Sequence, residues 1–322
     1  MELCITSNMP GKKVAVIGAG YVGASIAYSL TITGLAREIV LIECPEAVEK
    51  CKAEVNDIRH GIPNICSPIV HCGDYSDIRD CDLIIVAAGR NRHPGETRLE
   101  MTADNFRVAT QIAKSIKEYY TKGVIVVVTN PVDIITEVLA NSLALPDGMV
   151  FGTGCLLDSS RLTSVISDYI GVCNEGINAH VIGEHGDGQI ILWSKATIAG
   201  VQIDEFCQMN GLVFTEDTKI MIEKKVRLMG EEIIRGKGRT HYGIATCVCY
   251  IADVVLNCRS TIISVSSMLN GEYGLNGIAL SLPSIVTSNG VKCRLIDSLS
   301  SAELSKLHAV AKKLSSVLNG LY

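Results

Sequence analysis

Short runs of apolar, mostly β-branched residues alternate in the first half of the chain with longer stretches in which apolar residues recur every three or four positions. The four runs are VAVIG at Val14–Gly18, EIVLIE at Glu38–Glu43, DLIIVAAG at Asp82–Gly89 and VIVVVTN at Val124–Asn130. Strands that are buried on both faces of a parallel sheet have this composition. We therefore predict four parallel strands at these positions.

The stretches between the runs predict helices. Apolar residues from Val22 to Leu30 follow at helical spacing and precede Gly34, a residue type that often ends a helix, and residues 101–120 show the same periodicity. Alternating strands and helices build a parallel sheet with helices on both faces. The first half is therefore predicted to be an α/β, doubly wound domain.

The second half has a less regular pattern, which predicts an α+β domain. Helices are expected at residues 158–169, 215–235, 242–257 and 302–318, and strands at 176–182 and 260–269. A chain of 322 residues is also longer than one hydrophobic core usually serves. We place the boundary near Phe151, with residues 1–151 as the first domain and 152–322 as the second.

The composition is that of a folded globular protein and disfavours two classes of partner. The chain is 48% hydrophobic and 20% charged, and its net charge is −5 with basic residues scattered along it. It therefore offers no positive stripe for nucleic acid or for an anionic membrane, and no apolar run approaches the roughly 20 residues of a membrane span. The positive mean hydropathy is consistent with surface buried between subunits, so we expect a homo-oligomer, either a dimer or a tetramer.

Thirteen cysteines are present, but they form no CxxC pair, and residues 1–11 (MELCITSNMPG) have no charged start or apolar core of a signal peptide. We expect reduced thiols in a cytoplasmic protein. Cys247 and Cys249 lack a second pair, so no metal site is expected.

Glycines cluster directly after the first predicted strand. The segment GAGYVG at Gly18–Gly23 has the spacing GxGxxG, lies between a strand and a helix, and is followed 20 residues later by an acid, Glu43. In this context Gly18 permits a sharp turn, Gly20 lets the backbone approach a pyrophosphate, and Gly23 lets helix and strand pack closely. The first domain is therefore predicted to be a Rossmann-type dinucleotide-binding domain, with the phosphates at the helix N-terminus.

The acid at the end of the second strand, Glu43, indicates which dinucleotide binds. A carboxylate accepts hydrogen bonds from ribose hydroxyls and repels a 2′-phosphate. The next residues, Cys44 and Pro45, bring no cation to compensate. We expect NAD as the cofactor rather than NADP.

Polar residues with catalytic chemistry occur in four further segments. These are PGETR with Arg98, TNPVD with Asn130, LLDSSRL with Asp158 and Arg161, and VIGEHGDG with His185. Asp158 and Arg161 are three residues apart, which places them on one side of a helical turn. Taken singly, each of these residues has an alternative explanation as a surface charge or an ion-pair partner.

Together these motifs have the order and spacing of the lactate/malate dehydrogenase family, which the chain resembles from residue 12 to its C-terminus, most closely in its bacterial lactate-specific members. The resemblance implies that His185 gives a proton to the carbonyl oxygen of a 2-keto acid and that Asp158 fixes the tautomer of His185. It also implies that Arg161 binds the substrate carboxylate as a two-pronged fork, that Arg98 polarises the carbonyl, and that Asn130 supports the carbonyl and nicotinamide sites.

The same residue types suit hydride transfer to a ketone on physical grounds. Negative charge builds on the oxygen as the hydride arrives, so a positioned acid and a fixed cation lower the barrier, the acid alone by about 10²–10⁴-fold. Histidine exchanges protons near neutral pH, and the planar guanidinium of arginine makes two parallel hydrogen bonds to a carboxylate. The expected activity is hydride exchange between NADH and a small 2-keto acid.

The residues at the positions that determine substrate specificity indicate different substrates. Arg92, six residues before Arg98, stands where malate-specific members of the family carry arginine and lactate-specific members commonly carry glutamine. The remaining pocket positions resemble the lactate-specific members; they are Glu184, Trp193, Thr240 and Ile244. Thr240 would occupy space that a second substrate carboxylate needs. We favour pyruvate and L-lactate, with oxaloacetate and L-malate as the alternative.

A third hypothesis is a dinucleotide-binding protein without catalytic activity, because a fold does not by itself imply a function. The joint presence of His185, Asp158, Arg161 and Arg98 disfavours it.

Fructose bisphosphate, which activates many bacterial lactate dehydrogenases, is not expected to act here. The resemblance implies that it would bind through a basic residue two positions after Arg161 and a histidine seven positions before His185. Those positions hold Thr163 and Asn178, and neither is cationic.

Arg92 provides the first test. Arg90 and His93 make its segment basic, so we expect Arg92 to point into solvent, where one interaction is worth at most about 1 kcal/mol. Arg92→Gln should then change the ratio of kcat/KM for pyruvate to that for oxaloacetate by less than about tenfold. A wild-type preference for oxaloacetate that collapses in the variant would reverse our choice of substrate.

Overall fold

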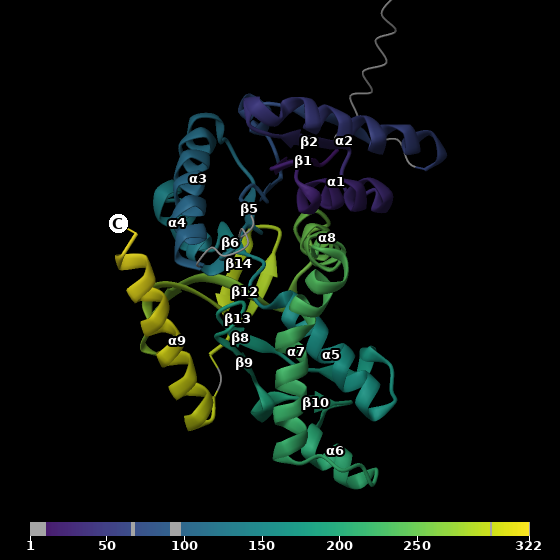
Figure 1. Ribbon diagram of the computed structural model, residues 1–322, viewed down its shortest axis with the longest axis vertical. Helices are drawn as coiled ribbons and strands as arrows, with labels where there is room; N and C mark the ends of the chain where they lie inside the picture. Colours follow the sequence, from purple (N-terminus) through teal and green to yellow (C-terminus); the bar gives the residue numbers. More distant parts are fainter. Residues whose placement is uncertain (1–10, 66–67, 91–97, 297, 322) are drawn as a thin grey trace, which may run out of the picture.

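The computed structural model describes residues 11–65, 68–90, 98–296 and 298–321, with only the backbone described at 98–100. Its first half contains a parallel sheet in the order β3-β2-β1-β4-β5-β6 (Figure 1). The strands are β1 (Lys13–Ile17), β2 (Glu38–Ile42), β3 (Ile69–Gly73), β4 (Leu83–Val86), β5 (Val124–Val127) and β6 (Val150–Gly152). This is the order of dinucleotide-binding sheets, and it confirms the predicted Rossmann-type class.

Helices cover both faces of this sheet. They are α1 (Tyr21–Thr33), α2 (Val48–Gly61), α3 (Arg98–Tyr119) and α4 (Val132–Leu143). The hydrophobic pattern did not reveal α2, α4, β3 or β6. Helix α2 buries a short stripe of Cys51, Val55 and Ile58, and α4 buries most of its residues on an amphipathic pattern, so both helices carry a helical periodicity that could have revealed them.

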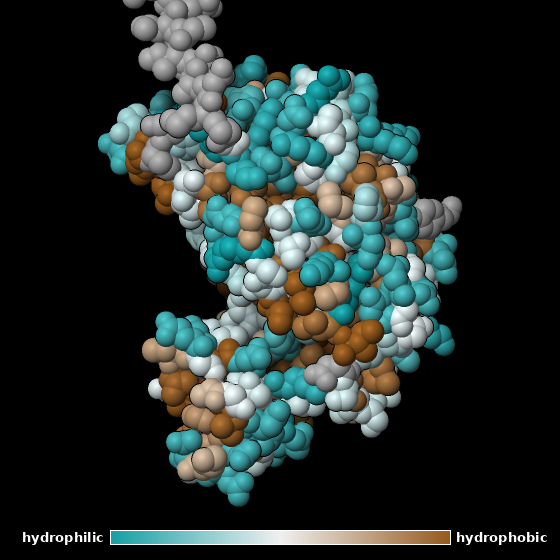
Figure 2. Space-filling view, turned by 180° about the vertical axis from the view of Figure 1, so that it is seen from behind, coloured by the Kyte–Doolittle hydropathy of each residue, from teal (hydrophilic) through white to brown (hydrophobic). Residues whose placement is uncertain are grey.

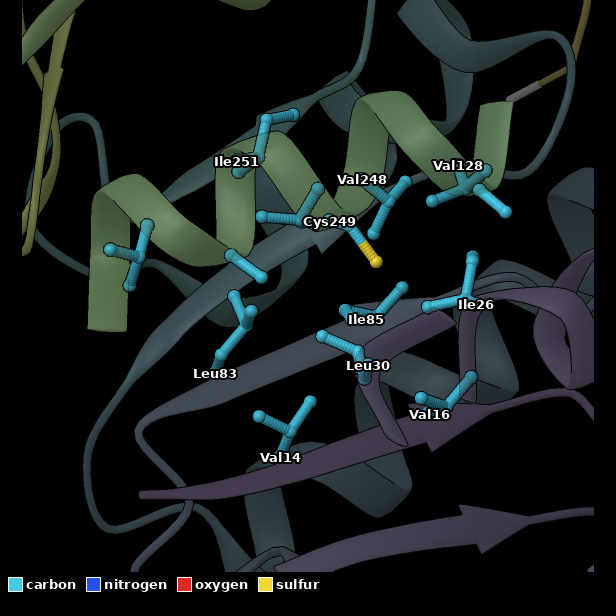
Figure 3. Close-up of a cluster of buried hydrophobic side chains, with 14 of the residues drawn as sticks. Val14, Val16, Ile26, Leu30, Leu83, Ile85, Val128, Val248, Cys249 and Ile251 are labelled. Carbon is cyan, nitrogen blue, oxygen red and sulfur yellow. The ribbon is translucent and has the colours of Figure 1, made fainter. Parts of the chain in front are cut away.

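Successive residues of the central strands point to opposite faces and enter two separate cores. Val14 and Val16 of β1 pack with Leu83 and Ile85 of β4 beneath α1 and α8 (Figure 3). The intervening residues of both strands, such as Ile84, belong to the core under α3 and α4. Burial on both faces is the reason that these strands appear in the sequence as continuous apolar runs.

The second half extends the same sheet with antiparallel strands, through the pairing of Ser266 with Gly152. The strands are β12 (Thr261–Asn270), β13 (Asn276–Thr287), β14 (Gly290–Arg294), β8 (Val181–Gly183) and β9 (Gln189–Ile191); a small sheet holds β7 (Ile177–Asn178), β10 (Thr197–Ile198) and β11 (Val201–Gln202). The helices are α5 (Leu156–Ile170), α6 (Ile203–Met209), α7 (Glu216–Lys237), α8 (Tyr242–Leu256) and α9 (Ser301–Asn319).

The prediction of one strand at residues 176–182 is wrong. The chain forms β7 in the small sheet and then crosses to the main sheet as β8. His180 marks the crossing, since its carbonyl accepts a hydrogen bond from the amide of Leu192, next to β9. The single apolar run therefore serves two sheets.

The two halves are joined by more than the chain connection. Helix α8 of the second half packs beside α1 and covers the first half's strands (Figures 1 and 3). The boundary near Phe151 remains a prediction. Within the described parts of the chain, no helix is long and apolar enough to cross a membrane.

Candidate active site

The residues predicted to bind the cofactor gather at one edge of the sheet. Gly18 follows β1, Glu43 follows β2 and Asn130 closely follows β5. Parallel strands bring their carboxyl ends together, and ligands of open α/β sheets bind there. This edge is where the structure places the candidate site.

The three glycines of the turn are required for different reasons. Gly18 has φ +102°, and a Cβ there would lie 2.5 Å from the amide nitrogen of Ala88. A Cβ on Gly23 would lie 1.8 Å from the carbonyl oxygen of Gly18, so this glycine allows helix and strand to pack. A Cβ on Gly20 would meet no protein atom within 4 Å. Gly20 therefore keeps open a space outside the protein's own packing.

The start of α1 fits an anionic ligand. Gly20 is the N-cap and has no side chain to satisfy the first amides of the helix, and the first turn contains no acid. Free amides and the positive end of the helix dipole attract phosphate groups. These features, with the open space at Gly20, fit the pyrophosphate of a dinucleotide.

Glu43 is fixed beside the same turn. Its Oε2 accepts a hydrogen bond from the amide of Ala19 at 2.7 Å, and its Oε1 accepts one from the amide of Cys44 at 2.9 Å. Each carboxylate oxygen has a second lone pair for a ribose hydroxyl. The position of Glu43 is thus set by the glycine turn itself.

Asn105 on α3, which sequence reasoning missed, ties the ends of β4 and β5 together. Its side chain accepts from the amide of Arg90 at 2.9 Å and donates to the carbonyl oxygens of Arg90 and Asn130, at 3.1 and 2.7 Å. Asn130 is exposed and joined to Pro131 by a cis peptide bond. Because the bonds of Asn105 go to distant backbone groups, no local pattern could have indicated them.

The segment between these strand ends is only partly described. Arg92 and His93 lie outside the described residues, and so does the side chain of Arg98, at which α3 begins. Arg90, which we grouped with these basic residues, forms an ion pair with Asp104 through its Nε at 2.8 Å. The predicted roles of Arg92 and Arg98 therefore remain predictions.

The structure brings His185, Asp158 and Arg161 together. Asp158 is on the first turn of α5, and its side chain is only 4% exposed. Its Oδ2 lies 2.6 Å from Nδ1 of His185, in the loop after β8, and its Oδ1 accepts from Nη1 of Arg161 at 3.1 Å. One buried carboxylate therefore holds a histidine and an arginine at once.

The charges of this group act on each other. Burial favours the neutral imidazole, but the Asp158 carboxylate, aided by Asp133, outweighs it and raises the pKa of His185. Burial also favours a neutral Asp158, but His185 and Arg161 together lower the pKa of that carboxyl. The result is an ionised aspartate beside a histidine that holds its proton to higher pH than usual.

Glycine also shapes the surroundings of Arg161. A Cβ at Gly230 on α7 would lie 3.5 Å from Nη2 of the guanidinium, so α7 passes close to it. Nη1 of Arg161 is engaged by Asp158, and the side chain is 13% exposed. A fixed, partly buried guanidinium of this kind suits a carboxylate ligand.

Asp133 is a second carboxylate at this site that sequence reasoning did not single out. It lies in the first turn of α4, and its Oδ2 accepts from the backbone amide of His185 at 2.8 Å. Its only sequence signal is its place three residues after Asn130, in TNPVD.

The other predicted positions have varied surroundings. Thr240 is half-buried in the turn between α7 and α8, and Gly243 in the next helix packs against Leu157, beside Asp158. Trp193 donates to Glu223 at 2.9 Å and packs edge-on to a phenylalanine, so its contacts are structural.

The remaining pocket and effector positions lie on α8, α5 and β7 and in the loop after β8. Ile244 packs against the core under α1, and Glu184 lies 3.8 Å from Lys313 of α9. Thr163 on α5 bonds to the helix backbone, and Asn178 is exposed on β7.

This arrangement can bind an anion at α1, bind a carboxylate at Arg161 and exchange a proton at Nε2 of His185, which has no protein partner among the described residues. Over the same residues, no three His, Cys, Asp or Glu side chains are grouped to hold a metal ion. The side chains brought together here offer acid–base chemistry and fixed charges.

Comparison with known proteins gives one consistent result. Residues 12–152 match the family model described as lactate/malate dehydrogenase, NAD binding domain, and residues 155–321 match its alpha/beta C-terminal domain. The L-lactate dehydrogenase of Thermoanaerobacterium saccharolyticum is 38% identical over 310 residues, 96% of this chain and 99% of the relative. That of Acetivibrio thermocellus is 36% identical over 98% of this chain and 99% of the relative.

Solved structures agree with these sequence relatives. The minor L-lactate dehydrogenase from Enterococcus mundtii, in its ligand-bound form, superposes with a TM-score of 0.92 at 34% identity, covering 97% of this chain and 98% of that one. An L-lactate dehydrogenase from Clostridium thermocellum gives 0.84 at 39% identity, over 96% and 99%.

The glycine turn yields a paired prediction. Gly20→Ala should leave the melting temperature unchanged, because its φ of −74° is ordinary and its Cβ meets no protein atom, but should weaken NADH binding by about tenfold or more. Gly23→Ala should instead lower stability by about 1–3 kcal/mol through overpacking. Thermal unfolding and fluorescence titration with NADH measure both effects. Normal NADH affinity in Gly20→Ala would refute this account of the turn.

Proposed function

The chain belongs to the lactate/malate dehydrogenase family, and on that premise we propose that it is an NAD-dependent L-lactate dehydrogenase that interconverts pyruvate and L-lactate. The observation that carries the proposal is the buried Asp158 carboxylate, which binds His185 and Arg161 at the edge of the sheet where the glycine turn lies. The full-length L-lactate dehydrogenase relatives support the same reaction.

His185 is proposed as the proton donor. Asp158 accepts from Nδ1, which fixes the tautomer and leaves Nε2 to face the substrate. NAD, when bound, supplies the hydride as NADH or accepts it in its oxidised form. As the carbonyl carbon of pyruvate gains the hydride, Nε2 gives its proton to the carbonyl oxygen, and the Asp158 charge stabilises the imidazolium beforehand.

Arg161 is proposed to hold the substrate carboxylate. Its guanidinium is fixed by Asp158 on one side and lies close to α7 on the other, so a carboxylate bound to it has a defined orientation. Arg98 and Asn130 are proposed to polarise and support the carbonyl, and Thr240 to limit the space beside it. Gly18, Gly20, Gly23, Glu43 and Asn130 are proposed to bind the cofactor.

Pyruvate is the proposed keto acid rather than oxaloacetate. The relatives reported above are named L-lactate dehydrogenases, and this outweighs the malate alternative raised by Arg92. The arrangement of His185, Asp158 and Arg161 argues against a protein without catalytic activity, because burying a shared carboxylate has a cost that binding a dinucleotide alone does not require.

We also propose a cytoplasmic homo-oligomer, either a dimer or a tetramer. Large hydrophobic side chains are exposed on α1, α8 and β12; they include Tyr28, Ile32, Tyr250 and Ile262. Helices α1 and α8 pack side by side. Figure 2 shows further hydrophobic residues near the middle of the face opposite to that of Figure 1. Exposed apolar surface of this kind is typical of subunit contacts.

The activity is tested with the absorbance of NADH. The chain should oxidise NADH with pyruvate faster than with oxaloacetate, and His185→Asn should lower kcat by about a hundredfold or more while NADH still binds. Near-normal turnover in His185→Asn would remove His185 from the mechanism, and absence of turnover with either keto acid would refute the proposed function.

The pH dependence of the two directions gives a further test. Pyruvate reduction needs the imidazolium, so its kcat/KM should be constant below the raised pKa of His185 and fall about tenfold per pH unit above it. Lactate oxidation needs the neutral imidazole and should fall as pH drops below the same value. A loss of pyruvate reduction toward low pH, or a loss of lactate oxidation toward high pH, would contradict a single shared acid–base group at His185.

A further inference from the structure

A second buried carboxylate holds the loop that carries His185. Asp133, in the first turn of α4, is only 3% exposed, and its Oδ2 accepts from the amide of His185 at 2.8 Å. Its Oδ1 is buried without a well-formed hydrogen bond among the described residues, although the Ser266 hydroxyl is near enough to favour its charge. The proposed reaction assigns no task to Asp133, whose effect on the site so far is its contribution to the raised pKa of His185.

A neutral acceptor would be sufficient to bind one backbone amide. Burying a carboxylate is costly unless its charge is compensated, and half of this carboxylate has no well-formed partner. Asp133 accepts from the backbone amide of His185, so a negative charge retained on Asp133 favours the protonated form of that imidazole.

We propose that Asp133 is a positioning residue for the reaction, which fixes the main chain of His185 and adds a second negative charge that keeps its imidazole protonated. The inference rests on the proposed role of His185 as the acid. Asp158 aligns the ring through Nδ1, whereas Asp133 acts from the backbone side of the same residue.

The charged groups around His185 come from helices α4 and α5 and from its own loop. Asp158 and Arg161 face it from α5, and Asp133 faces it from α4; the two carboxylates favour the imidazolium and the guanidinium opposes it. Glu184, directly before His185, disfavours the Asp133 charge. The nearby Cys155 stays a neutral thiol, because burial raises its pKa well above the usual value. Together these charged groups favour the protonated imidazolium form of His185.

The state of Asp133 varies within the working range of pH. Burial raises the pKa of Asp133 to about 6, against the opposing effects of the Ser266 hydroxyl and of the amide and charge of His185. Near neutral pH Asp133 is therefore mostly ionised, as the proposal requires. Its charge is lost as pH falls through about 6, where His185 already holds its proton.

Glu137 provides a matched control one helical turn further along α4. It is a buried carboxylate, 8% exposed, and it also accepts a backbone amide from the second half of the chain, that of Ala279 at 3.3 Å. Burial raises its pKa too. It is not among the main charges that act on His185, which are those of Asp158, Asp133 and Arg161. Glu137→Gln therefore reproduces the loss of a buried charge on α4 without the effect on His185.

The test is an NMR titration of histidine in the full chain, labelled at the imidazole carbons. The chain has seven histidines, and the signal of His185 is the one that disappears in His185→Asn. In Asp133→Asn, which keeps an oxygen acceptor for the amide but removes the charge, the midpoint of His185 should move to lower pH. In Glu137→Gln it should not move.

Alongside, the ratio of kcat/KM for pyruvate at about pH 8 to that at about pH 6 should drop roughly threefold or more in Asp133→Asn only.

The outcomes separate this inference from the proposed function. An unchanged His185 midpoint in folded Asp133→Asn, or an equal shift in Glu137→Gln, would overturn it. A midpoint that moves without a matching change in the pH profile would support the action of Asp133 on His185 and count instead against His185 as the acid.

If Asp133→Asn does not fold, Ser266→Ala replaces it, because loss of that hydroxyl disfavours the Asp133 charge. A smaller shift in the same direction supports the proposal, and no shift refutes it.

Discussion

The site depends on one buried carboxylate, Asp158, whose two oxygens engage His185 and Arg161. Removing one partner of a buried ion pair typically costs about 3–5 kcal/mol, because the remaining charge has no solvent to stabilise it. His185 and Arg161 are therefore held in place by their bonds to Asp158 as well as by the backbone. The proposed reaction needs a proton donor and a carboxylate-binding group in addition to hydride transfer. Asp158 holds the residues proposed for both tasks.

The fold places this anchor beside the cofactor edge by continuing one sheet through both halves. Helix α5 begins just after β6, and the chain between them passes so close to β12 that a Cβ at Gly154 would lie 2.5 Å from the amide of Ser266. The amide of Cys155 then donates to the Ser281 hydroxyl of β13 at 3.0 Å. The position of Asp158 relative to the strand ends is thus set by backbone packing rather than by long side chains.

Much of this architecture could be predicted from the sequence. Strands that are buried on both faces appear in the sequence as apolar runs. The segment GAGYVG together with Glu43 indicated the edge of the sheet where the cofactor is expected to bind. The spacing of Asp158 and Arg161 indicated a shared helical face. Asp133 and Asn105 could not be found in this way, because each bonds to backbone amides or carbonyls of distant segments and needs no matching side chain there. Helix α4 was missed although Val132, Ile135, Val138 and Leu139 recur at helical spacing, so the sequence did carry a signal for this helix.

The most direct test of the shared anchor is the pH dependence of the affinity of oxamate, an unreactive analogue of pyruvate with a carboxylate and a carbonyl, for the NADH complex. In the wild type, the dissociation constant should be flat at low pH and rise as pH passes the raised pKa of His185. In Asp158→Asn the rise should begin at lower pH, and binding should be weaker at every pH because Arg161 has lost its fixed partner. Equal pH dependence in the two proteins, with Arg161 still binding oxamate normally, would contradict the account.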